Sequence, residues 1–230
     1  MWEKRFAAVV AVLVICFITV VAGERGQNDT TESRQTAQVT GKVYGYEKTV
    51  ALTFDDGPHS RYTKELLEGL RERGVKATFF VVGENIEGNE DIIKQMYEDG
   101  HVIGNHTYNH VELTKLSKEA ALLEIEKTNS LIEKITGEPV KYIRPPCGSW
   151  KESMLYEVNM TPVFWNVDPM DWCTYQVSTV VNRIMNDVED GDIILFHDIY
   201  DSSVAAALEV VDRLLSMGYV FVTVDGIIIE

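Results

Sequence analysis

Basic residues are scarce in this chain of 230 residues, which has 21 Lys and Arg against 36 Asp and Glu and a formal net charge of -15. This acidic balance excludes binding to nucleic acid or other anionic polymers by bulk electrostatic attraction. The chain also lacks internal repeats and low-complexity blocks. Its length therefore fits one domain with a short leader better than two domains.

Cysteine is also rare. Of the three cysteines, only Cys147 and Cys173 lie outside the first 22 residues. A single disulfide between them could form in an oxidising compartment. Because a sequence gives no distance between two Cβ atoms, we predict two unpaired thiols instead.

The first 22 residues have the pattern of an export signal. Lys4 and Arg5 precede an apolar run over residues 6–22 that ends in small residues. This run is intermediate in length between a signal-peptide core and a minimal membrane span, so residues 1–22 are either a cleaved signal peptide or an N-terminal membrane anchor. We expect a disordered polar tether over residues 23–40 and a single folded domain over residues 41–230.

The segment Thr53–Pro58, TFDDGP, places two adjacent carboxylates at the end of a predicted strand. Val50–Phe54 is apolar and β-branched, which is typical of a buried strand, and Gly57-Pro58 forces a turn after it. Active sites of parallel α/β folds form at the C-terminal ends of strands. Taken alone, the segment fits a plain turn, because Asp, Gly and Pro are common turn residues.

His106 and His110 lie four residues apart, after the strand-like segment 101–105. On a helical turn both imidazoles could point at one ion, although the pair could also be two polar loop histidines. Two His with one Asp or Glu form a standard catalytic zinc set, so the neighbouring carboxylates favour a metal site. His197 ends a third apolar strand, Asp192–Phe196.

Helical and strand-like segments alternate along the chain, which predicts parallel strands joined by right-handed crossovers. An open doubly wound sheet would fit this alternation. A barrel is favoured because polar motifs follow at least five strands, and closure brings so many strand ends around one centre. We expect helices over 62–73, 89–99, 116–136, 177–188 and 202–217, and strands over 50–54, 76–82, 101–105, 140–144, 161–167, 192–196 and 219–224.

Five short motifs occur in the order and approximate spacing found in polysaccharide deacetylases of carbohydrate esterase family 4, the NodB-homology domain. They are TFDDGP, HTYNH at 106–110, RPPCG at 144–148, DPMDW at 168–172 and LFHD at 195–198. The chain resembles this family over residues 48–230. The resemblance implies an α/β fold, a distorted (β/α) barrel with seven or eight parallel strands in a single domain.

Two positions depart from the family pattern. Cys147 stands where the family often has an aromatic residue, and Trp150-Lys151 stands where an Asn often follows Gly148. Both positions concern the rim of the groove, so they bear on the choice of substrate more than on the chemistry.

The resemblance implies a role in amide hydrolysis for several motif residues. The metal ligands would be Asp56, His106 and His110, binding Zn²⁺ or alternatively Co²⁺, Mn²⁺ or Ni²⁺. Asp55 would be the general base and Arg144 its counter-charge, although an Arg before Pro-Pro can also be a surface residue. His197 would be the general acid, and Asp171 would hold its ring in the right tautomer.

The resemblance also implies a substrate-binding set. The backbone N–H of Cys147 would help to bind the oxyanion, and Trp172 and Leu195 would form the walls of a pocket for the acetyl methyl group. Ordinary core packing would explain Trp172 and Leu195 equally. For Asp168 and Asp198 we expect capping or loop hydrogen bonds.

The predicted function is metal-dependent hydrolysis of N-acetyl groups from N-acetylglucosamine-type polysaccharide, first of all cell-wall peptidoglycan and then chitin-type oligosaccharides. We expect an exported monomer in the extracellular space or cell wall, attached to a membrane only through residues 1–22. One alternative is an O-acetyl ester hydrolase acting on xylan. Another is a catalytically silent carbohydrate-binding homologue, but a binding module has no need of a base, an acid and a metal site together.

Overall fold

The computed structural model describes residues 47–228. The leader and tether predicted over residues 1–40 lie outside this range. Within it, no helix combines the length and apolar character needed to cross a membrane.

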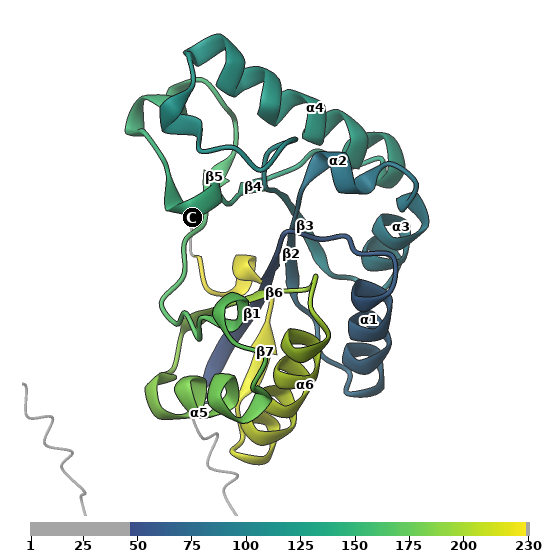
Figure 1. The fold of residues 1–230 in the computed structure, drawn as a ribbon, viewed down its shortest axis with the longest axis vertical. Helices are drawn as coiled ribbons and strands as arrows, with labels where there is room; N and C mark the ends of the chain where they lie inside the picture. Colours follow the sequence, from purple (N-terminus) through teal and green to yellow (C-terminus); the bar gives the residue numbers. More distant parts are fainter. Residues whose placement is uncertain (1–46, 229–230) are drawn as a thin grey trace, which may run out of the picture. The chain divides into compact units, whose positions relative to one another are not determined.

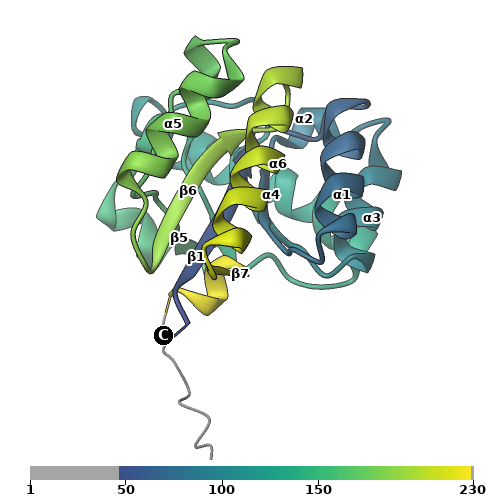
Figure 2. The same ribbon diagram turned by 90° about the horizontal axis from the view of Figure 1, so that it is seen from below.

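In the described residues, seven strands form one sheet: β1 (Thr49–Asp55), β2 (Thr78–Val81), β3 (Val102–Asn105), β4 (Tyr142–Ile143), β5 (Thr161–Pro162), β6 (Asp192–His197) and β7 (Val220–Val222). The α-helices are α1 (Tyr62–Glu72), α2 (Gly83–Ile86), α3 (Glu90–Glu98), α4 (Lys118–Thr136), α5 (Val177–Asp187) and α6 (Asp201–Ser216). Short 3₁₀ helices include η1 (Leu113–Lys115), η2 (Pro146–Gly148), η3 (Glu152–Tyr156), η4 (Asp171–Cys173) and η5 (Val224–Gly226). The longer helices lie outside the sheet (Figures 1 and 2).

Every strand pair in the sheet is parallel, and the strand order is β5-β4-β3-β2-β1-β6. One edge of β1 pairs with β6 along residues 50–55. The other edge is shared, because β7 pairs with residues 49–51 and β2 with residues 53–55. These observations confirm the predicted α/β class with parallel strands.

The segment 161–167 links the two edges of the curled sheet. At its start, Thr161 N–H donates to the Lys141 carbonyl at 2.8 Å and Val163 N–H to the Ile143 carbonyl at 2.8 Å. At its end, Asn166 N–H donates to the Ile193 carbonyl of β6 at 3.0 Å. The sequence predicted one strand over this segment, but only Thr161–Pro162 form a strand, and the chain then crosses from β4 to β6.

The side chains of β1 point alternately to the two faces of the sheet and pack in two different hydrophobic clusters. Val50, Leu52 and Phe54 belong to the large cluster buried between sheet and helices, whereas Ala51 packs with Phe80 in a smaller cluster inside the curl. Because side chains alternate along a strand, Thr53 and Asp55 share the inner face with Ala51. This alternation places a carboxylate at the inner end of β1.

The expected strand over 140–144 is reduced to two residues, β4. Arg144 N–H still donates to the Asn105 carbonyl at 2.9 Å, but Pro145 and Pro146 follow and have no N–H to extend the ladder. The segment between β4 and β5 then contains the 3₁₀ helices η2 and η3.

Candidate active site

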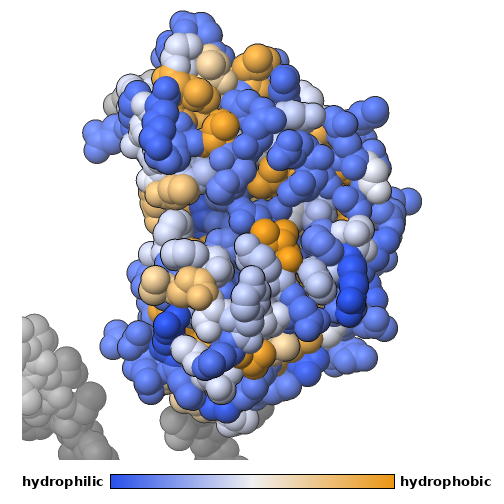
Figure 3. Space-filling view, viewed as in Figure 1, coloured by the Kyte–Doolittle hydropathy of each residue, from blue (hydrophilic) through white to orange (hydrophobic). Residues whose placement is uncertain are grey.

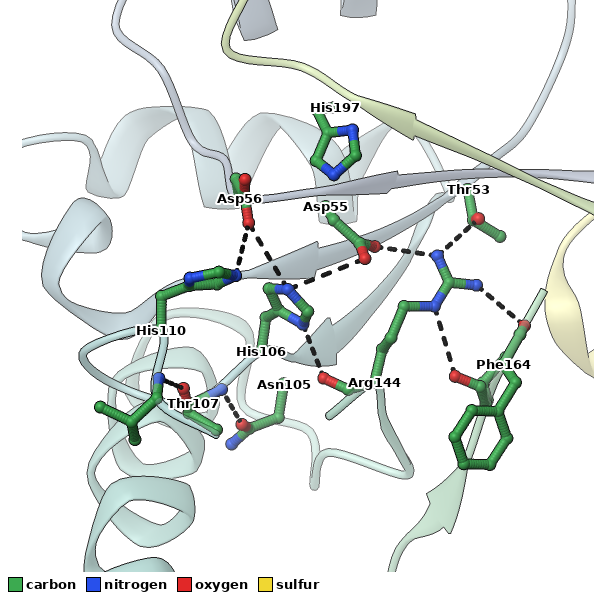
Figure 4. A network of polar contacts seen from close by, with 12 residues as sticks. Thr53, Asp55, Asp56, Asn105, His106, Thr107, His110, Arg144, Phe164 and His197 are labelled. Carbon is green, nitrogen blue, oxygen red and sulfur yellow. Dashed lines mark hydrogen bonds and ion pairs between the residues drawn. The ribbon is translucent and has the colours of Figure 1, made fainter. Parts of the chain in front are cut away.

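The motif residues meet at the C-terminal ends of the parallel strands. Asp55 is the last residue of β1 and lies opposite His197, the last residue of β6. His106 follows β3, and Arg144 follows the neighbouring strand β4. In Figure 4 the aspartates Asp55 and Asp56 lie between His197 and the two histidines of the HTYNH motif.

Asp56, His106 and His110 converge on one point. Asp56 Oδ1 lies 3.5 Å from His106 Nε2 and 3.2 Å from His110 Nε2, and one potential ligand atom from each residue lies within 4.8 Å of the others. Burial alone would raise the pKa of Asp56, but the imidazoles of His106, His197 and His110 outweigh it and lower this pKa. Burial lowers the pKa of His110, which favours the neutral form that a metal ligand needs.

The two histidines are not brought together by a helical turn, so that part of the prediction is wrong. Residues 106–110 form an irregular loop in which Thr107 has φ 64° and His110 has φ 52°. Asn105 Oδ1 accepts the Thr107 N–H at 2.7 Å, and Thr107 Oγ1 accepts the Val111 N–H at 3.1 Å. Side-chain hydrogen bonds therefore hold this loop in place of helical ones.

Among the non-glycine residues of the described range, left-handed backbone occurs only in the motifs. In residues 47–228, five non-glycine residues have positive φ, and each belongs to a motif: Asp56, Thr107, His110, Cys147 and Met170. Such conformations cost about 1–3 kcal/mol each and persist only where the surroundings enforce them. Two of the five are candidate metal ligands.

The donor set fits a divalent metal ion. Asp56 Oδ1 is buried and has no hydrogen-bond partner within the described range, so it is available to a cation. His106 Nδ1 lies 2.6 Å from the Arg144 carbonyl oxygen and donates its proton there, which leaves Nε2 free for a metal. Two imidazole nitrogens and one carboxylate oxygen are a standard catalytic zinc set.

Asp55 contacts Arg144 more closely than it contacts His106. Arg144 Nη1 donates to Asp55 Oδ1 at 2.8 Å, whereas Asp55 Oδ2 is 3.7 Å from His106 Nε2. The guanidinium is fully buried inside the curl, where it faces the Phe80 ring at 4.3 Å. Arg144 also donates to Thr53 Oγ1 at 2.7 Å and to the carbonyl oxygens of Val163 and Phe164 in the segment 161–167.

His197 is held by Asp171, which is buried at the start of η4. Asp171 Oδ1 lies 2.8 Å from His197 Nδ1, and Asp171 Oδ2 accepts the His197 N–H at 2.9 Å. Burial opposes the charged imidazole, but the hydrogen bond and charge of Asp171, assisted by Asp55 and Asp56, raise the pKa of His197 to about 9. With Nδ1 donating to Asp171, Nε2 is the nitrogen directed toward the aspartates (Figure 4).

Replacing Asp171 by Asn should lower the pKa of His197, because the charge that favours imidazolium is removed. If His197 acts as an acid, the alkaline limb of kcat/KM against pH should move to lower pH. Stability provides a second measurement. The pKa of His197 in the folded protein, about 9, exceeds its ordinary value of 6.5. The stabilisation of the fold by the charged imidazole is therefore complete below pH 6.5 and is lost as pH rises through 9.

The free energy of unfolding should therefore fall in the wild type between these pH values and change less in Asp171→Asn. Urea unfolding at several pH values, followed by circular dichroism, measures this difference. The role of Asp171 is contradicted if Asp171→Asn has the same alkaline limb of kcat/KM as the wild type and the same change in the free energy of unfolding with pH.

The predicted substrate-binding residues occupy different environments. Cys147 is exposed in η2, with φ 56°, and Trp172 is 54% exposed in η4 beside Asp171. Leu195 is buried on the inner face of β6, two residues before His197. Cys147 and Cys173 are free thiols, as expected from the sequence. The roles of Cys147, Trp172 and Leu195 in binding stay predictions.

Two residues at the site were not assigned to it from the sequence. Thr53 Oγ1 accepts from Arg144 and donates to the Ile194 carbonyl at 2.7 Å, and its alternation with Asp55 could have indicated an inward position. Asp198 is fully buried and receives a hydrogen bond from Thr63, and burial raises its pKa to about 7. Asp168 makes the expected loop hydrogen bond, accepting the Met170 N–H at 2.8 Å.

The model of the family described as polysaccharide deacetylase matches residues 42–163. The chain belongs to this family. The polysaccharide deacetylase PdaC of Bacillus subtilis, named as a peptidoglycan-N-acetylmuramic acid deacetylase, is 40% identical over 179 residues, which are 78% of this chain and 38% of PdaC. The chain thus spans well under half the length of this relative.

Other members of the polysaccharide deacetylase family match over different lengths. A peptidoglycan-N-acetylglucosamine deacetylase of Bacillus cereus is 36% identical over 86% of this chain and 96% of its own length. The solved PdaC structure has a TM-score of 0.77 at 39% identity and covers 79% of this chain and 90% of that one. The Xyl-CE4 domain of a multidomain xylanase from a Trinervitermes trinervoides hindgut metagenome has a TM-score of 0.73 at 34% identity, with the same coverages. These structures confirm the predicted fold.

Proposed function

We propose that this polysaccharide deacetylase homologue is a metal-dependent hydrolase that removes N-acetyl groups from N-acetylglucosamine units of a cell-wall glycan. One observation carries the proposal. A potential metal site, a carboxylate paired with a buried arginine and a histidine paired with a buried aspartate all lie at the same ends of the strands. Amide hydrolysis needs a polarised carbonyl, a base and an acid, and this arrangement offers a group for each.

Asp56, His106 and His110 would hold the metal ion. Bound there, a divalent ion would supply a Lewis acid that polarises the acetyl carbonyl and makes water more acidic. Asp55 would accept a proton from the attacking water. Its carboxylate is held in place by the hydrogen bond from Arg144 Nη1 at 2.8 Å.

His197 would complete the reaction as the acid. After the water oxygen has bonded to the acetyl carbon, the C–N bond breaks and the nitrogen takes a proton from His197 Nε2, which gives acetate and a free amine. The bond to Asp171 keeps the proton of the other ring nitrogen in place, so that Nε2 is the nitrogen that exchanges protons with the substrate.

The substrate is inferred from the relatives and from charge. PdaC is named for N-acetylmuramic acid and the Bacillus cereus relative for N-acetylglucosamine, both in peptidoglycan. The acidic chain suits a neutral N-acetylglucosamine unit better than muramic acid, which carries an additional carboxylate. A wall substrate agrees with export through residues 1–22, which stays a prediction outside the described residues.

Metal removal tests the proposal. Purified protein should release acetate and free amine from N-acetylglucosamine oligomers, lose this activity after chelation and regain it with Zn²⁺ or Co²⁺. Circular dichroism should be nearly unchanged by chelation, because the buried core between sheet and helices does not depend on an ion.

The substrates separate the alternatives. Acetate release from acetylated xylan without amine formation on glucosamine oligomers would select an O-acetyl esterase, a possibility favoured by the likeness to the Xyl-CE4 domain. Glycan binding without acetate release in the presence of any metal would select a catalytically silent homologue. Full activity after exhaustive chelation, with metal absence established by elemental analysis, would exclude a metal-dependent mechanism.

A further inference from the structure

The turn after β1 must hold Asp56 in a conformation that the residue does not prefer. Asp56 has φ 74°, in the left-handed region, and its carboxylate is a candidate metal ligand. A ligand in strained backbone stays in place only if the surrounding contacts enforce it. The contacts around the turn 56–59 therefore decide whether the site is preorganised.

One side of the turn is held by the segment around α2. Asn85 Nδ2 donates to the Asp56 carbonyl oxygen at 2.8 Å, and Val82 N–H donates to the Gly57 carbonyl oxygen at 2.8 Å. These two bonds fix the peptide groups on both sides of Gly57, but from one direction only.

The opposite side of the turn rests on Asp198, the residue that follows β6. Its side chain is buried, and Oδ1 has no hydrogen-bond partner within residues 47–228. A Cβ atom added to Gly57 would lie 2.4 Å from Asp198 Oδ2 and 2.5 Å from Oδ1. The carboxyl group therefore packs directly against the backbone of the turn, where only glycine leaves room for it.

Thr63, near the start of α1, joins Asp198 to the end of the turn. Its hydroxyl donates to Asp198 Oδ2 and accepts the His59 N–H at 2.8 Å. Thr63 is fully buried. The turn is thus enclosed between the Asn85 side and the Asp198–Thr63 side, with Asp56 between them.

We propose that Asp198 and Thr63 form a positioning pair that holds the turn 56–59 and so places the carboxylate of Asp56 for metal binding. The inference rests on the proposed metal site and assigns no contact with substrate to either residue. It predicts that metal affinity depends on the Thr63 hydroxyl and on the shape and acceptor oxygen of residue 198.

The test measures Co²⁺ binding to metal-free protein by competition with a chromophoric chelator, and the visible spectrum of bound Co²⁺ as a report on coordination geometry. Asp198→Ala and Thr63→Val should weaken Co²⁺ binding by about 10–100-fold, the usual effect of removing a partner that orients a ligand, and should alter the spectrum. Asp198→Asn and Thr63→Ser keep the acceptor and the hydroxyl, and should bind Co²⁺ almost as the wild type does.

Thr78→Val is the matched control. Thr78 is also fully buried and its hydroxyl oxygen also accepts a backbone N–H, that of Val224 at 3.1 Å, but it contacts neither the turn nor a candidate ligand. It should lose a similar amount of stability in thermal unfolding without the loss of Co²⁺ affinity.

Wild-type affinity and spectrum in folded Asp198→Ala and Thr63→Val would overturn the positioning pair, as would an equal loss of affinity in Thr78→Val. If Asp198→Ala does not fold, the Thr63 variants decide the question. A wild-type protein that binds no Co²⁺ would contradict the proposed metal site itself, which separates that failure from failure of the pair alone.

Discussion

Arg144→Met should lower the free energy of unfolding by about 3–5 kcal/mol, because it leaves the buried carboxylate of Asp55 without a counter-charge. The guanidinium and this carboxylate are both buried, at 0% and 5% side-chain exposure. For a domain of this size the loss corresponds to a fall in Tm of roughly 6–20 °C. Thermal unfolding at pH 7 measures the change in Tm, and urea titration at the same pH measures the change in the free energy of unfolding.

Two controls distinguish the buried pair from a general effect of losing arginine. Arg73→Met breaks a partly exposed ion pair with Asp212, in which the Arg73 side chain is 24% exposed, and should cost about 1 kcal/mol, because ion pairs near the surface contribute little. Combining Arg144→Met with Asp55→Asn removes both charges and should recover part of the lost stability. If Arg144→Met is no more harmful than Arg73→Met, the buried charge pair is not an important contributor to the fold.

Asp55→Asn and Asp56→Asn should both lose activity, but for different reasons. Asp55→Asn should retain the metal and lose turnover by about 10²–10⁴-fold, the usual effect of removing a general base. Asp56→Asn should lose metal affinity first, because Asp56 Oδ1 faces both histidines. Asn is the proper replacement at position 56, since it tolerates the left-handed φ of 74° better than Ala does.

Metal content by elemental analysis and acetate release by a coupled assay, measured on the same preparations, distinguish the two aspartates. Asp55 Oδ2 also lies 3.7 Å from His106 Nε2, so the same experiment tests the reversed assignment. Loss of metal in Asp55→Asn with retention in Asp56→Asn would reverse the two roles.

Much of this site could be predicted because its residues stand in motifs at the ends of apolar strands. The run Val50–Phe54 predicts β1, and the carboxylates that follow it lie where the chain leaves the sheet. Such signals are local in sequence. They give the family, the fold class and the residues that gather at the strand ends.

Contacts between distant segments could not be predicted in the same way. Asp198 and Thr63 are 135 residues apart, and nothing near either residue indicates the other. The loop that joins His106 to His110 depends on left-handed residues, which the spacing of two histidines does not reveal. The crossing of residues 161–167 from β4 to β6 depends on the curl of the whole sheet.

On the face shown in Figure 3, hydrophobic residues occur singly or in small groups among hydrophilic ones. Monomeric proteins usually have such surfaces, since large apolar patches mark contact sites.

The segment 161–167 also affects how the protein behaves beside other copies of itself. A free edge of a parallel sheet can template pairing with a strand of another chain, which leads to aggregation. Here β6, the terminal strand of the sheet order, has Asn166 and Val167 bonded along it. The Asn166 side chain further accepts the Ile193 N–H at 3.1 Å. The connection that supplies carbonyls to Arg144 therefore also occupies part of the edge of β6 that another chain could otherwise pair with.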